Sequence, residues 1–270
     1  MHILVTNDDG VTAPGLLALA QAVRPLGKVS VLAPDRNWTA GGHVKTLHRP
    51  LRARPVTLDD GTPALASDGA PSDCVSMAVM GLIEEKIDLV VSGINPNENM
   101  GHDITYSGTV TAAMEAVIHG IPGIAFSLAS PDAHEKQLDF GPAGAIARRI
   151  VQTVLERGWD EDLLLNVNIP YLQTDQMKGI RITRQGMRVY HDELDARIDP
   201  RGRPYYWIGG EWPTGIPNEG TDIGALAEGY VSVTPLQLDL TDYDRLHALR
   251  RHDWRIDSLD LQETDKPGAD

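Results

Sequence analysis

Short apolar runs alternate with segments of helical periodicity over the first 170 residues, and no other feature constrains the fold as strongly. Residues 2–6 are an apolar, largely β-branched run that predicts a buried strand, and a turn sequence at residues 7–10 ends it. Leu, Ala and Val recur at helical spacing over residues 16–23, and residues 29–34 form a second apolar run that ends in proline. A strand, a helix and a second strand in succession predict a βαβ unit.

The same alternation continues along the chain. It predicts helices over residues 72–83, 110–119 and 141–155, and strands over residues 88–94, 124–128 and 163–169. These strands lack the polar alternation of a half-exposed sheet, which is typical of parallel strands buried on both faces. The sequence therefore predicts an α/β protein whose mainly parallel sheet is covered by helices on both faces.

Beyond about residue 180 the chain becomes rich in Arg, Tyr, Trp, Gly and Pro. Residues 205–212 predict an antiparallel hairpin that projects from the sheet. Its aromatic side chains need to be buried, either on the chain's own core or against a partner subunit. A strand over residues 230–234 and a short helix over residues 243–250 are expected to follow. We therefore divide the chain into a core over 1–180, a hairpin extension over 181–250 and an acidic tail over 251–270.

Composition excludes several classes of protein. The net charge of −14 argues against a groove that neutralises the phosphates of a long nucleic acid. The single cysteine excludes both a disulfide framework and a cysteine-rich zinc site. No run approaches the roughly 18 to 20 apolar residues that span a bilayer, and the N-terminus has no basic leader. We therefore expect a cytoplasmic protein that is not bound to a membrane.

Polar loops follow three of the predicted strands, at the edge where the ligand crevice of such a sheet lies. In the first loop, the adjacent carboxylates of Asp8 and Asp9 repel each other unless a cation lies beside them. Such hard oxygen ligands suit Mg²⁺ or Mn²⁺. The pair could equally form a turn or cap the helix that follows.

The other two loops are expected to meet the first at this edge. In the second, the Thr39 hydroxyl precedes small residues that let backbone N–H groups approach an anion or a metal, although such loops often only turn the chain. The third carries the amides of Asn95 and Asn99 and leads to Ser107 and Thr109 at a predicted helix N-terminus. That terminus could bind a phosphate or simply be capped.

Five motifs, in this order, resemble those of the survival protein SurE family. They are Val5-Thr6-Asn7-Asp8-Asp9-Gly10, Ala33-Pro34-Asp35 followed by Thr39, Gly69-Ala70-Pro71-Ser72-Asp73-Cys74-Val75, Val91-Ser92-Gly93-Ile94-Asn95 and Tyr106-Ser107-Gly108-Thr109-Val110. The likeness is strongest over residues 1–130 and extends to about residue 236. Each motif alone is weak, but five in register are specific.

The resemblance implies a Rossmann-like α/β core with a hairpin extension, assembled as a homodimer or homotetramer. It also implies a metal-dependent phosphatase acting on nucleoside monophosphates, with the choice between 5′- and 3′-phosphates left open. One divalent ion, Mg²⁺ or Mn²⁺, would be held by the ligand set Asp8, Asp9, Thr39 and Asn95. The substrate phosphate would lie on Ser107, Gly108 and Thr109, with Asn99 as a further donor.

In the mechanism that we expect, water attacks phosphorus directly. Asp8 and Asp9 are the catalytic carboxylates, and Asp9 orients or deprotonates the water. An aspartyl-phosphate mechanism would normally need two carboxylates separated by one residue, whereas Asp8 and Asp9 are adjacent. A protein that binds nucleotides without turnover is a further alternative.

Two positions depart from the family's pattern. Thr39 stands where most members have Ser, which keeps the hydroxyl. The family's Asn-x-Gly-x-Asn becomes Asn95-Pro96-Asn97-Glu98-Asn99. Asn97 and Glu98 thus add a side chain and a carboxylate where glycine usually lets the backbone come close, which puts substrate preference in doubt more than the metal site.

Overall fold

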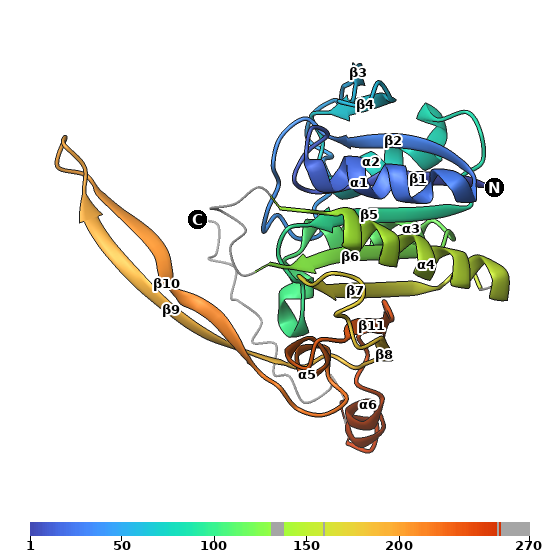
Figure 1. The fold of residues 1–270 in the computed structure, drawn as a ribbon. Coiled ribbons are helices and arrows are strands. Elements are labelled where there is room, and N and C mark those ends of the chain that lie inside the picture. Colours follow the sequence, from blue (N-terminus) through green and yellow to red (C-terminus); the bar gives the residue numbers. More distant parts are fainter. Residues whose placement is uncertain (131–137, 159, 253, 255–270) are drawn as a thin grey trace, which may run out of the picture. The chain divides into compact units, whose positions relative to one another are not determined.

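The computed structural model describes residues 1–130, 138–158, 160–252 and 254. The chain divides into a large unit, Met1–Leu236, and a small unit that begins at Gln237. The large unit contains a nine-stranded sheet with the order β3-β4-β2-β1-β5-β6-β7-β11-β8 (Figure 1). Its strands are β1 (His2–Thr6), β2 (Lys28–Pro34), β3 (Ala53–Thr57), β4 (Pro63–Ser67), β5 (Leu89–Asn95), β6 (Gly123–Ala129), β7 (Leu164–Pro170), β8 (Ile180–Ile182) and β11 (Val231–Leu236).

Helices cover both faces of this sheet. They are α1 (Pro14–Val23), α2 (Pro71–Met77), α3 (Gly108–Ile118), α4 (Gly141–Arg157) and α5 (Asp222–Ala227), with the short turns η1 (Arg24–Leu26), η2 (Ala78–Leu82) and η3 (Gly101–Thr105). Apolar residues of α1 and α4 form one hydrophobic core with one face of the sheet. Residues of α2 and α3 pack on the opposite face, around Leu4 and Leu32. The α/β class and the two covered faces are therefore confirmed.

The centre of the sheet is parallel, as the apolar strands predicted. β1 pairs in parallel with β2 on one side and with β5 on the other, and β5, β6 and β7 continue in the same direction. All residues of β1, β5 and β7 are buried. Burial on both faces explains why these strands are mainly apolar, although β7 has Asn166 and Asn168 among its apolar residues. Because β2, β1 and β5 run in the same direction, the loops that follow them lie at the same edge of the sheet.

Several elements differ from the sequence prediction. The helix expected over 72–83 is α-helical only to Met77, and the wider turn η2 follows it. The antiparallel pair β3 and β4 was not predicted, because Arg54 and Pro55 in an edge strand look like loop sequence. Helix α5 and strand β8 were also missed, since each is too short to show a period.

The predicted hairpin is present and is longer than expected. β9 (Met187–Ile198) and β10 (Pro204–Ile216) pair as a separate two-stranded antiparallel ribbon, which extends away from the sheet in Figure 1. Tyr206 and Trp207 on β10 are 60% and 62% exposed. Packing of these two aromatic side chains on the chain's own core, one of the two interpretations from sequence, is therefore wrong.

Among its described residues, the small unit has the short helix α6 (Tyr243–Leu249), near the range predicted from sequence. Most of the predicted tail over 251–270 lies outside the described residues, which include only 251, 252 and 254 of this range. Among the helices of the described chain, none is long and apolar enough to cross a membrane.

Candidate active site

The loops after β1 and β2 meet at the carboxyl edge of the sheet. The Asn7 side chain shapes the first loop, because it accepts from the Gly10 N–H at 3.2 Å and donates to the Gly10 carbonyl at 3.0 Å. The Trp38 N–H of the second loop donates to the Asp8 carbonyl at 2.8 Å. Thr39 therefore follows directly after Trp38, the residue that contacts the first loop. β5 runs beside β1, since Thr6, the last residue of β1, is the register partner of Ser92, and β5 then continues to Asn95.

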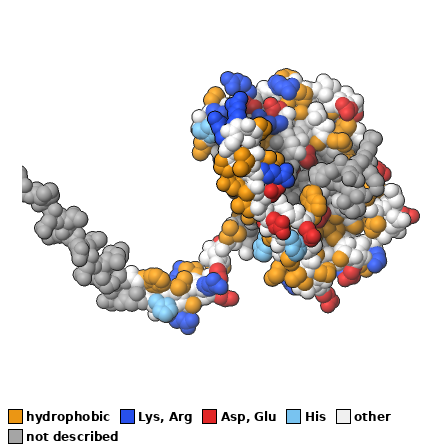
Figure 2. All heavy atoms as spheres, turned by 90° about the vertical axis from the view of Figure 1, so that its left-hand side faces the viewer, with side chains coloured by type: hydrophobic (Ala, Val, Ile, Leu, Met, Phe, Trp, Pro, Cys, Tyr) orange, Lys and Arg blue, Asp and Glu red, His pale blue; other side chains and the backbone are white. Residues whose placement is uncertain are grey.

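Figure 2 faces this edge, because the parallel strands point to the left in Figure 1. The hairpin, which lies at the left of Figure 1, is turned toward the viewer here, and hydrophobic side chains lie at the visible surface among basic, acidic and histidine side chains. No single charge dominates the view. The candidate site must therefore be identified from its polar contacts rather than from a charged patch.

The N-terminus of α3 closes around Asp8. The Thr109 hydroxyl donates a hydrogen bond to Asp8 Oδ1, and the backbone amides of Gly108 and Thr109 also face this carboxylate. Position 108 must be glycine, because a Cβ there would lie 2.6 Å from the Asp8 Cβ. The two motifs that are furthest apart in the resemblance, 5–10 and 106–110, are therefore in direct contact.

The two acidic side chains are in an environment that disfavours their charge. Asp8 is only 3% exposed, and burial raises its pKa even though hydrogen bonds from Thr109 and Gly108 oppose the shift. Burial and the neighbouring Asp8 charge raise the pKa of Asp9 to about 7. A cation beside the pair would favour the ionised form of both carboxylates. This electrostatic pattern fits a metal ion at the pair.

Thr39 and Asn95 lie on the loops that meet the Asp8 loop, but in the described residues no hydrogen bond joins either side chain to Asp8 or Asp9. Thr39 is exposed, and its N–H donates to Asn37 Oδ1 at 2.6 Å. Asn95 is buried, and its Nδ2 donates to the Asn97 carbonyl at 2.5 Å. Both retain a side-chain oxygen that could bind a cation.

The chemistry of the donor set also limits which metal ligands are possible. Among the described residues, no group of three or more His, Cys, Asp or Glu side chains could hold a metal ion. An ion at Asp8 and Asp9 would therefore need neutral oxygen ligands such as those of Thr39 and Asn95. Carboxylate, hydroxyl and amide oxygens suit a hard divalent cation.

Ser107 caps the N-terminus of α3. Capping was one of the two interpretations of this turn from sequence, and phosphate binding was the other. Its Oγ accepts a hydrogen bond from the Val110 N–H at 3.1 Å, while its hydroxyl proton stays available to a ligand. Ser107 and Thr109 are both buried. Capping and anion binding are compatible here, because the cap uses only an acceptor lone pair.

Asn99 is held more tightly than its loop position suggested. Its N–H donates to Asn168 Oδ1 at 2.8 Å, and its carbonyl accepts from Asn168 Nδ2 at 3.0 Å and Asn166 Nδ2 at 2.8 Å. Its own Nδ2 donates to Ser127 Oγ at 2.8 Å. These supporting residues on β6 and β7 were missed. The two asparagines alternating with apolar residues in an otherwise apolar strand were the signal that could have revealed them.

Glu115 anchors the loop that carries Thr39. It lies on α3, is 2% exposed, and accepts hydrogen bonds from His43 at 2.8 Å and Lys45 at 2.9 Å. Ser76 donates to it at 2.5 Å. Burial alone would raise the pKa of Glu115, but these hydrogen bonds lower it overall. The second loop is thereby fixed to the helix whose N-terminus surrounds Asp8. No local sequence pattern marks this pairing.

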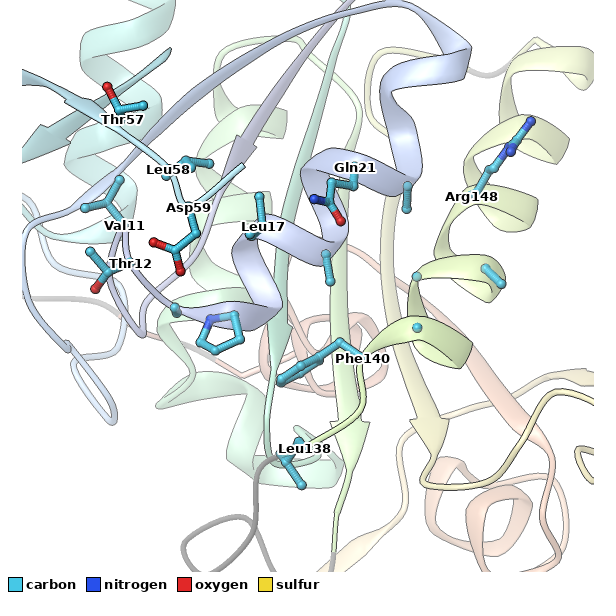
Figure 3. Close-up of a pocket in the computed structure, with 17 residues that line it drawn as sticks. Val11, Thr12, Leu17, Gln21, Thr57, Leu58, Asp59, Leu138, Phe140 and Arg148 are labelled. Atoms are coloured by element: carbon cyan, nitrogen blue, oxygen red, sulfur yellow. The ribbon is translucent and has the colours of Figure 1, made fainter. Parts of the chain in front are cut away.

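A pocket of about 620 Å³ lies between α1, α4 and the turn after β3 (Figure 3). Leu17 on α1 and Phe140 at the start of α4 face it, and Arg148 lines it further along α4. None of the predicted site residues lines this pocket. We base the candidate site on the polar contacts around Asp8, because the pocket brings no comparable group of ionisable side chains together.

Comparisons with known proteins agree on one family. The family model described as survival protein SurE matches residues 3–192. A protein of Chloroflexus aggregans named 5′-nucleotidase SurE is 53% identical over 94% of this chain and 100% of its own length. A protein of Herpetosiphon aurantiacus with the same name is 51% identical over 94% of this chain and 99% of its own.

A solved structure supports the same assignment. The crystal structure of the SurE protein from Aquifex aeolicus superposes with a TM-score of 0.78 at 45% sequence identity, covering 93% of this chain and 99% of that one. The likeness therefore extends over nearly the full length of both chains and includes the motifs that surround Asp8. This chain belongs to the survival protein SurE family.

Proposed function

We propose that the protein is a divalent-metal-dependent phosphatase that hydrolyses nucleoside 5′-monophosphates to nucleoside and phosphate. The observation that carries this proposal is the buried Asp8 carboxylate, which lies beside Asp9 and is enclosed by the N-terminus of α3. A cation would stabilise the charge of this carboxylate pair, and a helix N-terminus favours an anion. Together they suit a phosphate bound to a metal ion. The name 5′-nucleotidase, carried by relatives that match along their whole length, supports the substrate class.

We assign the metal ligands as Asp8, Asp9, Thr39 and Asn95, around one Mg²⁺ or Mn²⁺ ion. The raised pKa values of the two acids support this assignment, because a bound cation would relieve the cost of their charge. When bound, such an ion neutralises phosphoryl oxygens and favours ionisation of a nearby water. Asp9 has the more accessible carboxylate, and we assign it the orientation and deprotonation of that water.

The phosphate would bind on Ser107, Gly108 and Thr109. The dipole of α3 favours an anion there, and the available Ser107 hydroxyl adds a donor. Asn99 can add another donor only through the second N–H of its amide, since Ser127 uses the first. Direct attack by water is favoured over an aspartyl-phosphate, because Asp8 is buried and its Oδ1 already accepts the Thr109 hydrogen bond.

We further propose that the hairpin binds a partner subunit in a homodimer or homotetramer. Its large exposed hydrophobic residues, among them Tyr206, Trp207 and Ile208, support this assembly. A cytoplasmic location and the division into a core over 1–180, an extension over 181–250 and a tail over 251–270 are parts of the same proposal.

A phosphate-release assay tests the activity and separates it from the alternatives. Purified protein is stripped with EDTA and assayed with 5′- and 3′-mononucleotides and an aryl phosphate, with and without added Mg²⁺ or Mn²⁺. We expect release only with metal and preferentially from 5′-mononucleotides. Metal-dependent nucleotide binding without release would show a binding protein instead. A phosphorylated protein trapped by acid quench would replace direct water attack with an aspartyl-phosphate mechanism.

A further inference from the structure

The start of the hairpin packs against the loops that carry the candidate site. Gln185 Nε2 donates to the Gly101 carbonyl at 3.0 Å, and the N–H groups of Gly101 and Gly186 both donate to the buried Asp222 carboxylate, at 2.9 and 2.7 Å. The backbones are so close that a Cβ at position 101 would lie 2.7 Å from the Gly186 carbonyl oxygen. The hairpin is therefore attached to the segment between the Asn-rich loop and α3.

Arg188, at the second position of β9, makes the charged part of this contact. Its guanidinium pairs with Asp103 at 2.5 Å and with Glu98 at 3.2 Å, and its side chain is only 9% exposed. The Tyr190 hydroxyl donates to the other Asp103 oxygen at 2.6 Å. Burial would lower the pKa of Arg188, but the two carboxylates raise it overall. The guanidinium therefore stays charged between them.

The two carboxylates belong to different parts of the candidate site. Glu98 lies between Asn95, a proposed metal ligand, and Asn99. Asp103 lies in η3, and its backbone carbonyl accepts hydrogen bonds from the N–H groups of Tyr106 and Ser107 at 3.0 and 3.1 Å. A single arginine thus connects the metal-ligand loop to the turn that leads into the phosphate site. Glu98 is also one of the two residues that depart from the family's pattern in this loop.

We propose that Arg188 is a positioning residue of the phosphatase site, which holds the Asn95–Asn99 loop against the Ser107 turn and compensates Glu98 and Asp103 near the bound phosphate. This inference rests on the proposed function. Arg188 does not touch the reacting atoms; it acts through the two loops. The root of the hairpin is accordingly part of the active-site framework, in addition to any role of the hairpin in assembly.

The charge arrangement makes a specific prediction for substrate binding. Without Arg188, two carboxylates remain uncompensated on the loops that meet a phosphate dianion. Like charges that are partly exposed repel over a distance set by the ionic strength. An Arg188→Met variant should therefore show a raised KM that falls again as salt is added. Loss of packing alone would not give this salt dependence.

The experiment compares steady-state kinetics of wild type, Arg188→Met and Arg188→Lys with a 5′-mononucleotide at low and high salt. Arg181→Met is the matched control, because Arg181 pairs with Glu228 at 2.8 Å and lies against the Tyr230 ring, outside both loops. We expect kcat/KM to fall at least about tenfold in Arg188→Met and to change less than about twofold in the control. Arg188→Lys keeps the charge but not the two-pronged geometry, so it should recover KM more than kcat.

A double variant tests the charge directly. Glu98→Gln combined with Arg188→Met should regain part of the affinity lost in Arg188→Met, because one of the two uncompensated carboxylates is gone. Hydrogen exchange of residues 97–107 supplies a readout that needs no activity, and it should become faster in Arg188→Met but not in Arg181→Met. If Arg188→Met does not fold, the kinetics and hydrogen exchange of Arg188→Lys and Glu98→Gln are compared with wild type instead.

The outcomes separate this inference from the proposed function. An active wild type, with Arg188 variants that keep wild-type kinetics, salt dependence and exchange, would overturn the positioning role and leave the phosphatase intact. A wild type that releases no phosphate would remove the proposed function. In that case, unchanged exchange of residues 97–107 in Arg188→Met would also overturn the structural part of the inference.

Discussion

Gly108 is the residue on which the closest contact of the candidate site depends. Its missing side chain lets α3 begin directly against Asp8, where a Cβ would be 2.6 Å from the Asp8 Cβ. The sequence predicted that Asp8 and the Ser107–Thr109 turn belong to one site, because both follow strands that end at one edge. It could not predict that glycine at 108 is needed for the approach, since that requirement arises only from the tertiary contact.

We expect Gly108→Ala to destabilise the protein by about 1–3 kcal/mol and to lower activity, because overpacking here must displace Asp8. Gly144→Ala in α4 is the matched control. A Cβ at position 144 meets its nearest atom, the Ala22 Cβ, at an ordinary 3.5 Å. This substitution should be neutral or stabilise the helix by up to about 1 kcal/mol. Urea unfolding and phosphate release measure both effects, and equal stability of the two variants would contradict the close contact.

Glu115 gives a pH-dependent prediction. Its pKa is lowered from the ordinary 4.5 in the folded protein, so its charge stabilises the fold above that value. The contribution is lost as the pH falls through the lowered, folded-state pKa. Glu115→Gln should therefore cost about 1–3 kcal/mol near pH 7, with the cost shrinking below about pH 4.5.

The groups that face Glu115 are Ser76, His43, Lys45 and His119, the last at 3.2 Å. Denaturant unfolding of wild type and variant between pH 3.5 and 7 measures the difference. A difference that stays constant over this range would show that the carboxylate charge does not hold the second loop. Only the pair with His119, four residues along the same helix, could be predicted from spacing, because His43, Lys45 and Ser76 come from other segments of the chain.

At the level of elements, α3 combines a structural cap with the proposed phosphate site. Its start was predicted at residue 110, two residues too late, because Gly108 and Thr109 look like loop sequence. The Ser107 cap satisfies the Val110 N–H and leaves the first amides directed at Asp8. The central strands were predictable because their burial removes polar residues. The β3–β4 pair and the full length of the hairpin were harder to predict, because their exposed residues show no regular alternation of apolar and polar side chains.

A comparison of two helix-capping residues, Ser107 and Thr221, separates the structural role of Ser107 from its proposed role in phosphate binding. Thr221 caps α5 in the same way, accepting from the Gly224 N–H at 3.0 Å, and none of its described hydrogen bonds reaches a proposed metal or phosphate ligand. Ser107→Ala and Thr221→Ala should each cost about 1 kcal/mol of unfolding free energy. Only Ser107→Ala should also lose activity beyond what its stability explains. Equal residual activity in the two variants would reduce Ser107 to a cap.

At the scale of the molecule, the hairpin stands out because its aromatic side chains Tyr206 and Trp207 are left exposed in the single chain. The sequence indicated its aromatic content but left open whether a core or a partner covers it. The exposed Tyr206 and Trp207 favour a partner. The ionic contacts of Arg188 place the base of the same hairpin beside the candidate site. Assembly and catalysis could therefore depend on one element.

We expect wild-type protein to sediment as a dimer or tetramer and Tyr206→Ser/Trp207→Ser to shift toward the monomer. The shift follows because burial of large aromatic side chains dominates the energetics of such interfaces. Asp195→Ser, an exposed and charged position facing Trp207 across the ribbon, is the control and should leave the assembly unchanged. Sedimentation over a range of concentrations measures this, and a monomeric wild type would contradict the proposed assembly.

The proposed hydrolysis of a nucleoside 5′-monophosphate depends on the Asp8–Asp9 pair and a divalent ion. Phosphate release by Asp8→Asn with Mn²⁺ tests it most directly, because the substitution preserves shape and removes one charge. We expect a rate at least about a hundredfold below wild type, with the fold retained. A correctly folded Asp8→Asn protein that released phosphate at the wild-type rate would contradict it.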